Sequence, residues 1–251
     1  MTANLPVLGE STKSSLVVAE LERRILSGEL PPGERLPTES ELCEALAVSR
    51  SVIRDAIRTL AARGLVDVRQ GRGMTVAKPD TNAFGHALMV LLSRAGLTMG
   101  EVVDGRGELE SSLVGSAALR GGPEDWGLLE ASLEKFSQAV DASGWEEARQ
   151  SHLQFHLGIF RALHLPALDV FLLPMAEIIV VSAAPPRLEA EEDWEVATHY
   201  PILESLRKGD PAAAGKAMRE HFRATMGEKR YGEFRSRPFG QVFTELPWAT
   251  P

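Results

Sequence analysis

Residues Thr38–Lys78 read TESELCEALAVSRSVIRDAIRTLAARGLVDVRQGRGMTVAK, and this stretch decides the fold of the N-terminal part of the chain. Thr38 and Glu41 have the spacing of a capping box, in which each side chain satisfies a backbone donor at the start of a helix. After a short break, the Ser49 hydroxyl is placed to cap a second helix that runs to about Arg63. One side of this second helix has the spacing of a buried face, with Ile53, Ala56, Ile57 and Leu60.

The rest of the stretch predicts a small hairpin and a basic surface. Gly64 ends the second helix, and residues 66–69 and 74–77 then alternate like two strands joined by the turn 70–73. Three arginines repeat at i, i+4, i+8 on a face other than the apolar one, namely Arg50, Arg54 and Arg58. Helix, turn, basic helix and hairpin together predict a winged helix-turn-helix, which is a DNA-reading fold.

The composition indicates a soluble, cytoplasmic protein with one basic surface. The chain has 251 residues, of which 44% are hydrophobic, so two domains with real cores are feasible. Its net charge is −8, yet Arg50–Lys78 holds seven basic and two acidic residues, a local footprint suited to phosphate attraction. The single cysteine, Cys43, excludes an intrachain disulfide. We find neither a signal-peptide pattern nor a membrane-length apolar run, so no membrane partner is expected.

The expected fold class is mainly α. Residues 11–78 form the winged helix-turn-helix domain, and Lys78-Pro79-Asp80 breaks the pattern at a domain boundary. Residues 80–234 have almost no strand pattern and a succession of amphipathic segments, which predicts an antiparallel bundle of six or seven helices. Residues 235–251 contain three prolines and are expected to form an irregular tail.

The first ~78 residues resemble the N-terminal domain of the GntR family of bacterial transcription regulators. The matching positions, in order, are 25–33, 36–39, 41–42, 48–50, 52–56, Leu60, 64–66 and 71–73. The resemblance implies that DNA is contacted by Arg35, Ser49, Arg50, Ser51, Arg54, Gln70 and Gly71. Arg35 matches a position that touches backbone phosphate in the family.

The chemistry of these side chains agrees with such a role. An arginine near the start of a recognition helix can present two donors to guanine O6 and N7, and hydroxyls there suit phosphate contacts. The alternative is that the arginines form only a solvated face. That alternative is strongest for Arg58, which lies further along the helix and can pair with Asp55.

Four of the six histidines lie on apolar helix faces. His152 and His156 share one face at i, i+4, while His199 and His221 lie on the apolar stripes of two later helices. A lone histidine of this kind is usually a hydrogen-bonded core residue. Four together are hard to satisfy singly, and convergence on one metal ion would satisfy them all, because divalent ions accept several imidazoles.

The C-terminal part more weakly resembles the all-helical ligand-binding domain of the FadR subfamily. This resemblance implies that residues 80–234 form an effector-binding and dimerisation domain. In the metal-binding branch of that subfamily, an aspartate stands four residues before a Phe-His pair, and two histidines follow. Phe155-His156 and Met218–His221 match this pattern, whereas His152 stands where aspartate is usual. The resemblance implies one divalent ion held by His152, His156, His199 and His221, with zinc first and nickel or manganese as alternatives. Vestigial, metal-free histidines are the rival interpretation.

Arg106 stands where the first bundle helices of this subfamily often supply an arginine that faces the effector cavity. The resemblance therefore implies a role in effector binding. The alternative is an exposed ion pair with Glu110 at i+4, worth only about 0.3–0.5 kcal/mol. Gly105 and Gly107 beside Arg106 are also unfavourable inside a helix.

Together these features predict a regulator and not an enzyme. We expect a ligand-responsive repressor of metabolic genes that binds double-stranded operator DNA as a homodimer and senses a small carboxylate. One alternative is a metal-dependent hydrolase using the His152/His156 helix, but that segment lacks the glutamate that a zincin carries directly after its first histidine. The other is a ligand-independent architectural DNA binder, which would not need a domain with buried histidines.

Overall fold

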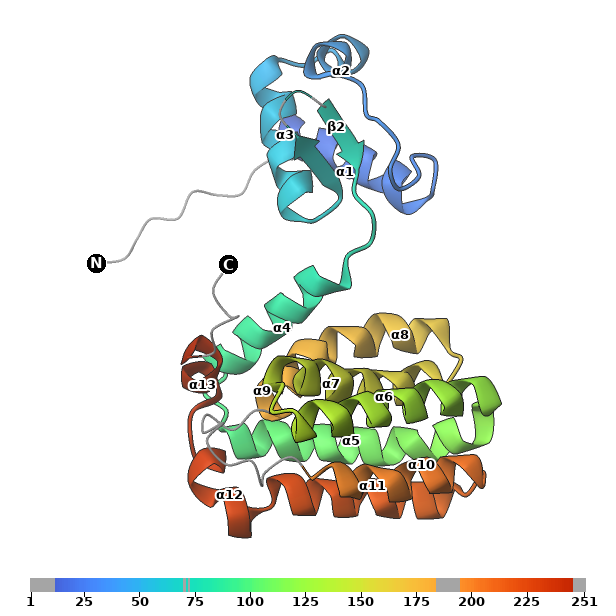
Figure 1. The fold of residues 1–251 in the computed structure, drawn as a ribbon. Helices are drawn as coiled ribbons and strands as arrows, with labels where there is room; N and C mark the ends of the chain where they lie inside the picture. Colours follow the sequence, from blue (N-terminus) through green and yellow to red (C-terminus); the bar gives the residue numbers. More distant parts are fainter. Residues whose placement is uncertain (1–11, 70, 72, 184–194, 246–251) are drawn as a thin grey trace, which may run out of the picture. The chain divides into compact units, whose positions relative to one another are not determined.

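The computed structural model describes residues 12–69, 71, 73–183 and 195–245. The chain divides into two compact units, Met1–Asp80 and Thr81–Pro251 (Figure 1). The predicted fold class is confirmed, because the described residues are mostly helical and their one sheet is a two-stranded hairpin in the first unit.

The described residues of the first unit form three helices and a hairpin: α1 (Lys13–Leu26), α2 (Glu39–Leu46), α3 (Arg50–Ala62), β1 (Val66–Arg69) and β2 (Gly73–Val76). The strands are antiparallel, with Val66 opposite Val76. Residues 33–36 pair with β2 as a short third segment, in which the Leu36 N–H donates to the Met74 carbonyl and the Val76 N–H donates to the Glu34 carbonyl. The winged helix-turn-helix is confirmed, and the third segment was not predicted.

Local sequence explains where α2 and α3 begin. The capping box at α2 is confirmed, since the Glu41 N–H donates to Thr38 Oγ1 and the Thr38 N–H donates to the Glu41 carboxylate. The prediction that the Ser49 hydroxyl caps α3 is wrong. Ser49 is the N-cap residue, but its Oγ lies 2.9 Å from Ser51 Oγ and makes no capping bond. The predicted buried face of α3 is confirmed and packs in the core of this unit.

The second unit contains the helices α4 (Thr81–Arg94), α5 (Met99–Arg120), α6 (Pro123–Asp141), α7 (Trp145–Arg161), α8 (Pro166–Leu172), η1 (Leu173–Met175), α9 (Ala176–Ala183), η2 (Val196–His199), α10 (Tyr200–Arg207), α11 (Pro211–Met226), α12 (Glu228–Arg235) and α13 (Phe239–Glu245). Asp210 caps the start of α11, because its carboxylate accepts from the Ala212 and Ala213 N–H groups. In this part of the chain, α5 to α11 form the bundle, and α4, α12 and α13 lie beside one end of it (Figure 1).

The main core of the bundle brings α5, α6, α7, α10 and α11 together. Its largest fully buried side chains include Phe136, Phe155 and Phe160. The described part of the unit has more helical segments than the six or seven predicted. Short segments such as α8 and α13 carry too few residues to give a periodic signal over several turns.

The prediction of an irregular tail over residues 235–251 is wrong for Phe239–Glu245, which form α13. Phe239 and Val242 are buried in a separate core with Met89 of α4 and Phe234 of α12. The Phe239 N–H donates to the Leu97 carbonyl, and the Met99 N–H donates to the Arg237 carbonyl. Tertiary packing therefore orders a segment whose prolines suggested irregular structure. Among the described helices, none combines the length and the apolar character that crossing a bilayer requires.

Candidate DNA-reading surface and metal centre

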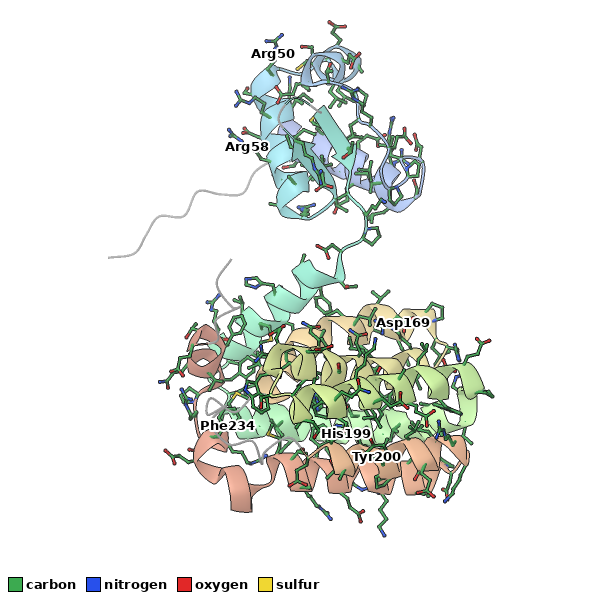
Figure 2. All side chains as sticks on the ribbon, in the orientation of Figure 1. Arg50, Arg58, Asp169, His199, Tyr200 and Phe234 are labelled. Carbon is green, nitrogen blue, oxygen red and sulfur yellow. The ribbon has the colours of Figure 1, made fainter. Side chains whose placement is uncertain are left out.

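The basic residues of α3 lie on its exposed side. Figure 2 labels Arg50 and Arg58, which project from the outer side of this helix. Arg50 Nη2 donates to Ser40 Oγ of α2 at 3.2 Å, and Arg58 pairs with Asp55 at 3.5 Å. Arg54 is exposed, and the described residues offer it no ion pair. Arg50 and Arg54 are thus available at the start of the helix, whereas Arg58 already has a carboxylate neighbour, as its sequence position suggested.

The turn between β1 and β2, in the same unit, contains the predicted DNA contacts Gln70 and Gly71. Gly71 has φ +77°, in the left-handed region that favours glycine, and Gly73 has φ +83°. A Cβ on Gly73 would lie 3.4 Å from Arg35 Nη2, so the absence of a side chain there gives the guanidinium room beside the strand. Ser49 and Ser51 are exposed at the start of α3. Gln70, the remaining predicted DNA contact, lies outside the described residues.

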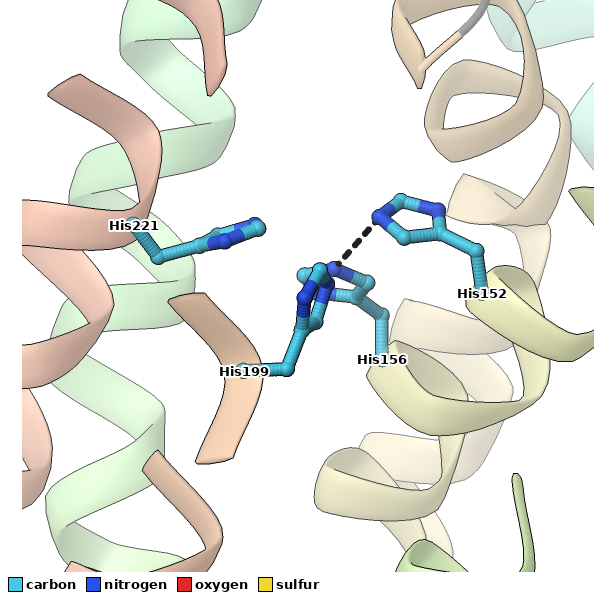
Figure 3. Close-up of side chains that lie close together, drawn as sticks. All are labelled: His152, His156, His199 and His221. Atoms are coloured by element: carbon cyan, nitrogen blue, oxygen red, sulfur yellow. Dashed lines mark hydrogen bonds between the residues drawn. The ribbon is translucent and has the colours of Figure 1, made fainter. Parts of the chain in front are cut away.

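The four predicted histidine ligands converge in the core of the second unit (Figure 3). His152 and His156 come from α7, His221 comes from α11, and His199 ends the 3₁₀ turn η2 just before α10. Each offers a ring nitrogen, and these atoms all lie within 4.8 Å of one another. His156 is 0% and His152 is 7% exposed. Chain segments far apart in sequence therefore meet in one buried cluster of imidazoles.

Hydrogen bonds to Nδ1 orient three of these rings. His156 Nδ1 lies 2.5 Å from Glu110 Oε2, and His199 Nδ1 lies 3.2 Å from the carbonyls of Glu195 and Val196. His221 Nδ1 lies 2.8 Å from Thr198 Oγ1, whose own proton goes to the Glu195 carbonyl. In these three rings Nδ1 is therefore the donor, which leaves the Nε2 lone pair for another partner.

The ring nitrogens of the cluster could hold a metal ion. His199 Nε2 is buried and has no hydrogen-bond partner in the described residues. His152 Nε2 and His156 Nε2 lie 3.1 Å apart. Two nitrogens bound to one tetrahedral ion at 2.0–2.1 Å are about 3.3 Å apart, so the observed spacing is close to that of shared ligation. The donor set of four imidazoles suits zinc and similar borderline ions.

Arg106 is buried, so the alternative of an exposed ion pair is wrong. It is 4% exposed, its Nε donates to Glu110 Oε1 at 2.5 Å, and its guanidinium lies 5.0 Å from the centre of the Phe222 ring. Gly107 faces the same ring, and a Cβ there would lie 3.3 Å from it. The helix accepts this glycine because Phe222 occupies the space that a side chain would need.

Glu110 makes a contact with the histidine cluster that sequence reasoning missed. It was considered only as a partner of Arg106, yet its two oxygens join Arg106 to His156. Glu110 is 1% exposed. A signal was present in the sequence, because Val103, Glu110, Val114 and Ala117 share one buried stripe of α5. A carboxylate on such a stripe needs a buried partner.

Comparisons with known proteins agree with the two-unit organisation. Residues 13–76 match the family profile described as "Bacterial regulatory proteins, gntR family", and residues 101–224 match the FCD domain. The chain is 31% identical to the Glc operon transcriptional activator of Escherichia coli K12, over 82% of this chain and 85% of the relative. It is 30% identical to the HTH-type transcriptional repressor NanR of Salmonella newport, over 85% and 84%. The chain belongs to the GntR family.

A solved structure of a Streptococcus agalactiae GntR protein is similar as well, with a TM-score of 0.63 and 27% identity over 84% of this chain and 97% of that one. The chain is therefore a ligand-responsive, DNA-binding transcription regulator of the GntR family with an FCD domain. Its similar relatives are transcription regulators and include one activator and one repressor. The predicted sign of regulation, repression, stays a prediction.

The electrostatics of this GntR-family regulator keep its four histidines neutral. Burial, and after it the nearby His156, lower the pKa of His199 to about 3. Burial also lowers the pKa of His152 and His221 well below 6.5 and lowers that of His156. Burial raises the pKa of Glu110, but Arg106 and His156 outweigh this effect and bring it to about 2. Neutral imidazole is the form that binds metal ions.

Proposed function

We propose that this GntR-family regulator holds one divalent metal ion with His152, His156, His199 and His221 and senses a small organic carboxylate there. The observation that carries the proposal is the convergence of four buried imidazoles, with ring nitrogens within 4.8 Å of one another. Zinc is the first choice, and nickel is the alternative that the all-nitrogen donor set also suits. Manganese fits less well, because it prefers oxygen ligands.

The metal would supply a positive charge that can hold an effector carboxylate. Four neutral imidazoles cancel none of that charge, so an anionic effector is favoured over a neutral or cationic one. Arg106 is the proposed second anchor, since it is buried in the same region and bonds through Glu110 to His156. A metal ion and a nearby guanidinium suit a carboxylate better than a sugar hydroxyl.

For the first unit, we propose operator recognition by Arg35, Ser49, Arg50, Ser51, Arg54, Gln70 and Gly71. The supporting observation is that Arg50 and Arg54 are exposed at the start of α3, where a recognition helix reads bases. One such unit covers only a short half-site, so the regulator should act as a homodimer on a pseudo-palindromic operator. The proposed targets are metabolic genes.

A thermal-shift screen of organic acids against the metal-loaded protein tests the effector proposal. A carboxylate effector should raise the melting temperature of wild type, because ligand binding to the folded state stabilises it. The same acid should change operator affinity in a titration with labelled DNA. The matched control is the corresponding amide, which keeps the shape and removes the charge. Equal shifts with the acid and the amide would contradict recognition through a metal-held carboxylate.

A further inference from the structure

We propose that Glu110 is a positioning residue of the metal site: it fixes the ligating nitrogen of His156 and provides, from behind the ligand, the negative charge that four imidazoles lack. This inference rests on the proposed metal site. The metal site could exist without this contact, so the role of Glu110 can be tested separately. The Glu110–His156 hydrogen bond, between α5 and α7, is the juxtaposition that motivates it.

Glu110 orients the His156 ring. Glu110 Oε2 lies 2.5 Å from His156 Nδ1, and the two side chains are 1% and 0% exposed. A carboxylate oxygen can only accept, so Nδ1 carries the proton and Nε2 keeps its lone pair. The Nε2 of His156 lies 3.1 Å from the Nε2 of His152, inside the cluster. The bond therefore holds the ring in the tautomer and direction that ligation requires.

Glu110 also adds a negative charge beside the site. All four candidate ligands are imidazoles, so none of them cancels any of the charge of a divalent ion. Arg106 adds a further permanent positive charge nearby. Glu110 lies between them, since its other oxygen accepts from Arg106 Nε at 2.5 Å. Glu110 thus brings a carboxylate to His156, whereas Thr198 offers a hydroxyl to His221 and backbone carbonyls face His199.

The contact of Glu110 with α7 goes beyond its ion pair within α5. Arg106 and Glu110 alone form a buried salt bridge within α5, and this salt bridge does not require a bond to α7. The second oxygen of Glu110 instead reaches across to a residue 46 positions away. Second-shell carboxylates of this kind raise the basicity of a ligating histidine and polarise it toward the ion.

The test is metal affinity in the full-length protein, measured by competition with a chromogenic zinc chelator. Glu110→Gln keeps the size of the side chain and removes its charge, so it should weaken zinc binding roughly 10- to 100-fold. Glu108→Gln is the matched control, because Glu108 is an exposed carboxylate on the same helix, and its affinity should equal that of wild type. Circular dichroism of both metal-free variants checks that the bundle is folded.

A rescue variant separates charge from general damage. Glu110→Gln combined with His152→Asp restores an anionic group next to the ion and should recover most of the lost affinity. If wild type binds zinc and Glu110→Gln binds it equally well, the role of Glu110 is overturned while the metal site stands. If affinity falls but the double variant shows no recovery, the charge argument is overturned. If wild type itself binds no zinc, nickel or manganese, the metal site fails, and this inference fails with it.

Discussion

At the scale of single residues, Arg50 and Arg54 carry the DNA-reading prediction. Both are exposed near the start of α3. Replacing either by alanine should cost roughly 1–3 kcal/mol of operator binding, because an arginine can make two hydrogen bonds to one guanine. Arg58→Ala is the control and should cost less, since Arg58 pairs with Asp55. Titration and footprinting on operator DNA measure the effect. Undiminished operator affinity of both variants would contradict the prediction that the start of α3 reads the bases.

The buried histidines make a second prediction at this scale, for the metal-free protein. In the unfolded chain these side chains take up protons near pH 6.5, whereas in the folded chain burial lowers the pKa of His199 to about 3. The unfolded state then binds more protons, so stability should be full above about pH 6.5 and fall as the pH drops below it. Between roughly pH 6.5 and 5 the ordinary carboxylates stay ionised, so the histidines dominate this window.

Thermal unfolding of chelator-treated protein across that window measures this loss. His199→Asn removes one of the groups with a lowered pKa and should give a shallower fall of the melting temperature. His86→Asn is the control, because His86 is exposed. If wild type and His199→Asn lost stability in parallel, the buried histidines would not be the source of the pH dependence.

At the residue scale, the sequence predicts contacts between neighbouring residues better than contacts between distant ones. The capping box of Thr38 and Glu41 and the buried face of α3 follow from spacing alone, and both were predicted. The histidine cluster needed the apolar stripes of separate segments and a family resemblance. The Glu110–His156 bond joins residues 46 positions apart, and only the packing of α5 against α7 specifies it. Spacing within one helix therefore predicts the Arg106–Glu110 pair but not the contact between Glu110 and His156.

At the scale of elements, α13 is the clearest case of tertiary packing deciding structure. Its seven residues are too few to give a periodic pattern over several turns, and Pro238 precedes it. Phe239 is nevertheless 0% exposed and packs with Met89 of α4 and Phe234 of α12. The winged helix-turn-helix was predictable because its turns and caps are coded locally. α13 was not predictable, because its packing partners include residues far away in the sequence, such as Met89 and Met99.

Phe239→Ala tests the contribution of α13. Removing a fully buried phenylalanine ring should destabilise the C-terminal unit by about 3–5 kcal/mol, through lost burial and the cavity left behind. Phe84→Ala on α4 is the matched control, because Phe84 is 52% exposed, and its effect should be much smaller. Denaturant unfolding followed by circular dichroism compares the two variants. Equal stability of Phe239→Ala and wild type would mean that α13 contributes no packing energy.

At the scale of the whole molecule, assembly follows from the demands of operator recognition. One winged helix offers few base contacts, so two copies are needed for tight binding to a pseudo-palindrome. We expect light scattering of the full chain to give twice the mass of one chain, and we expect the segment from Asp80 onward to do the same. A dimeric full chain with a monomeric C-terminal segment at tens of micromolar would move the dimer contact to the N-terminal unit. A monomeric full chain would contradict dimerisation itself.

The metal site is the central claim for the whole regulator, and elemental analysis tests it most directly. The protein should be made without a polyhistidine tag and purified without chelators, so that any ion found is held by the chain itself. We predict about one divalent ion per chain, and we predict that chelation lowers the melting temperature of the C-terminal unit until zinc is returned. A metal content near zero, with melting unchanged on addition of zinc, nickel or manganese, would contradict the claim and leave the four histidines as core residues.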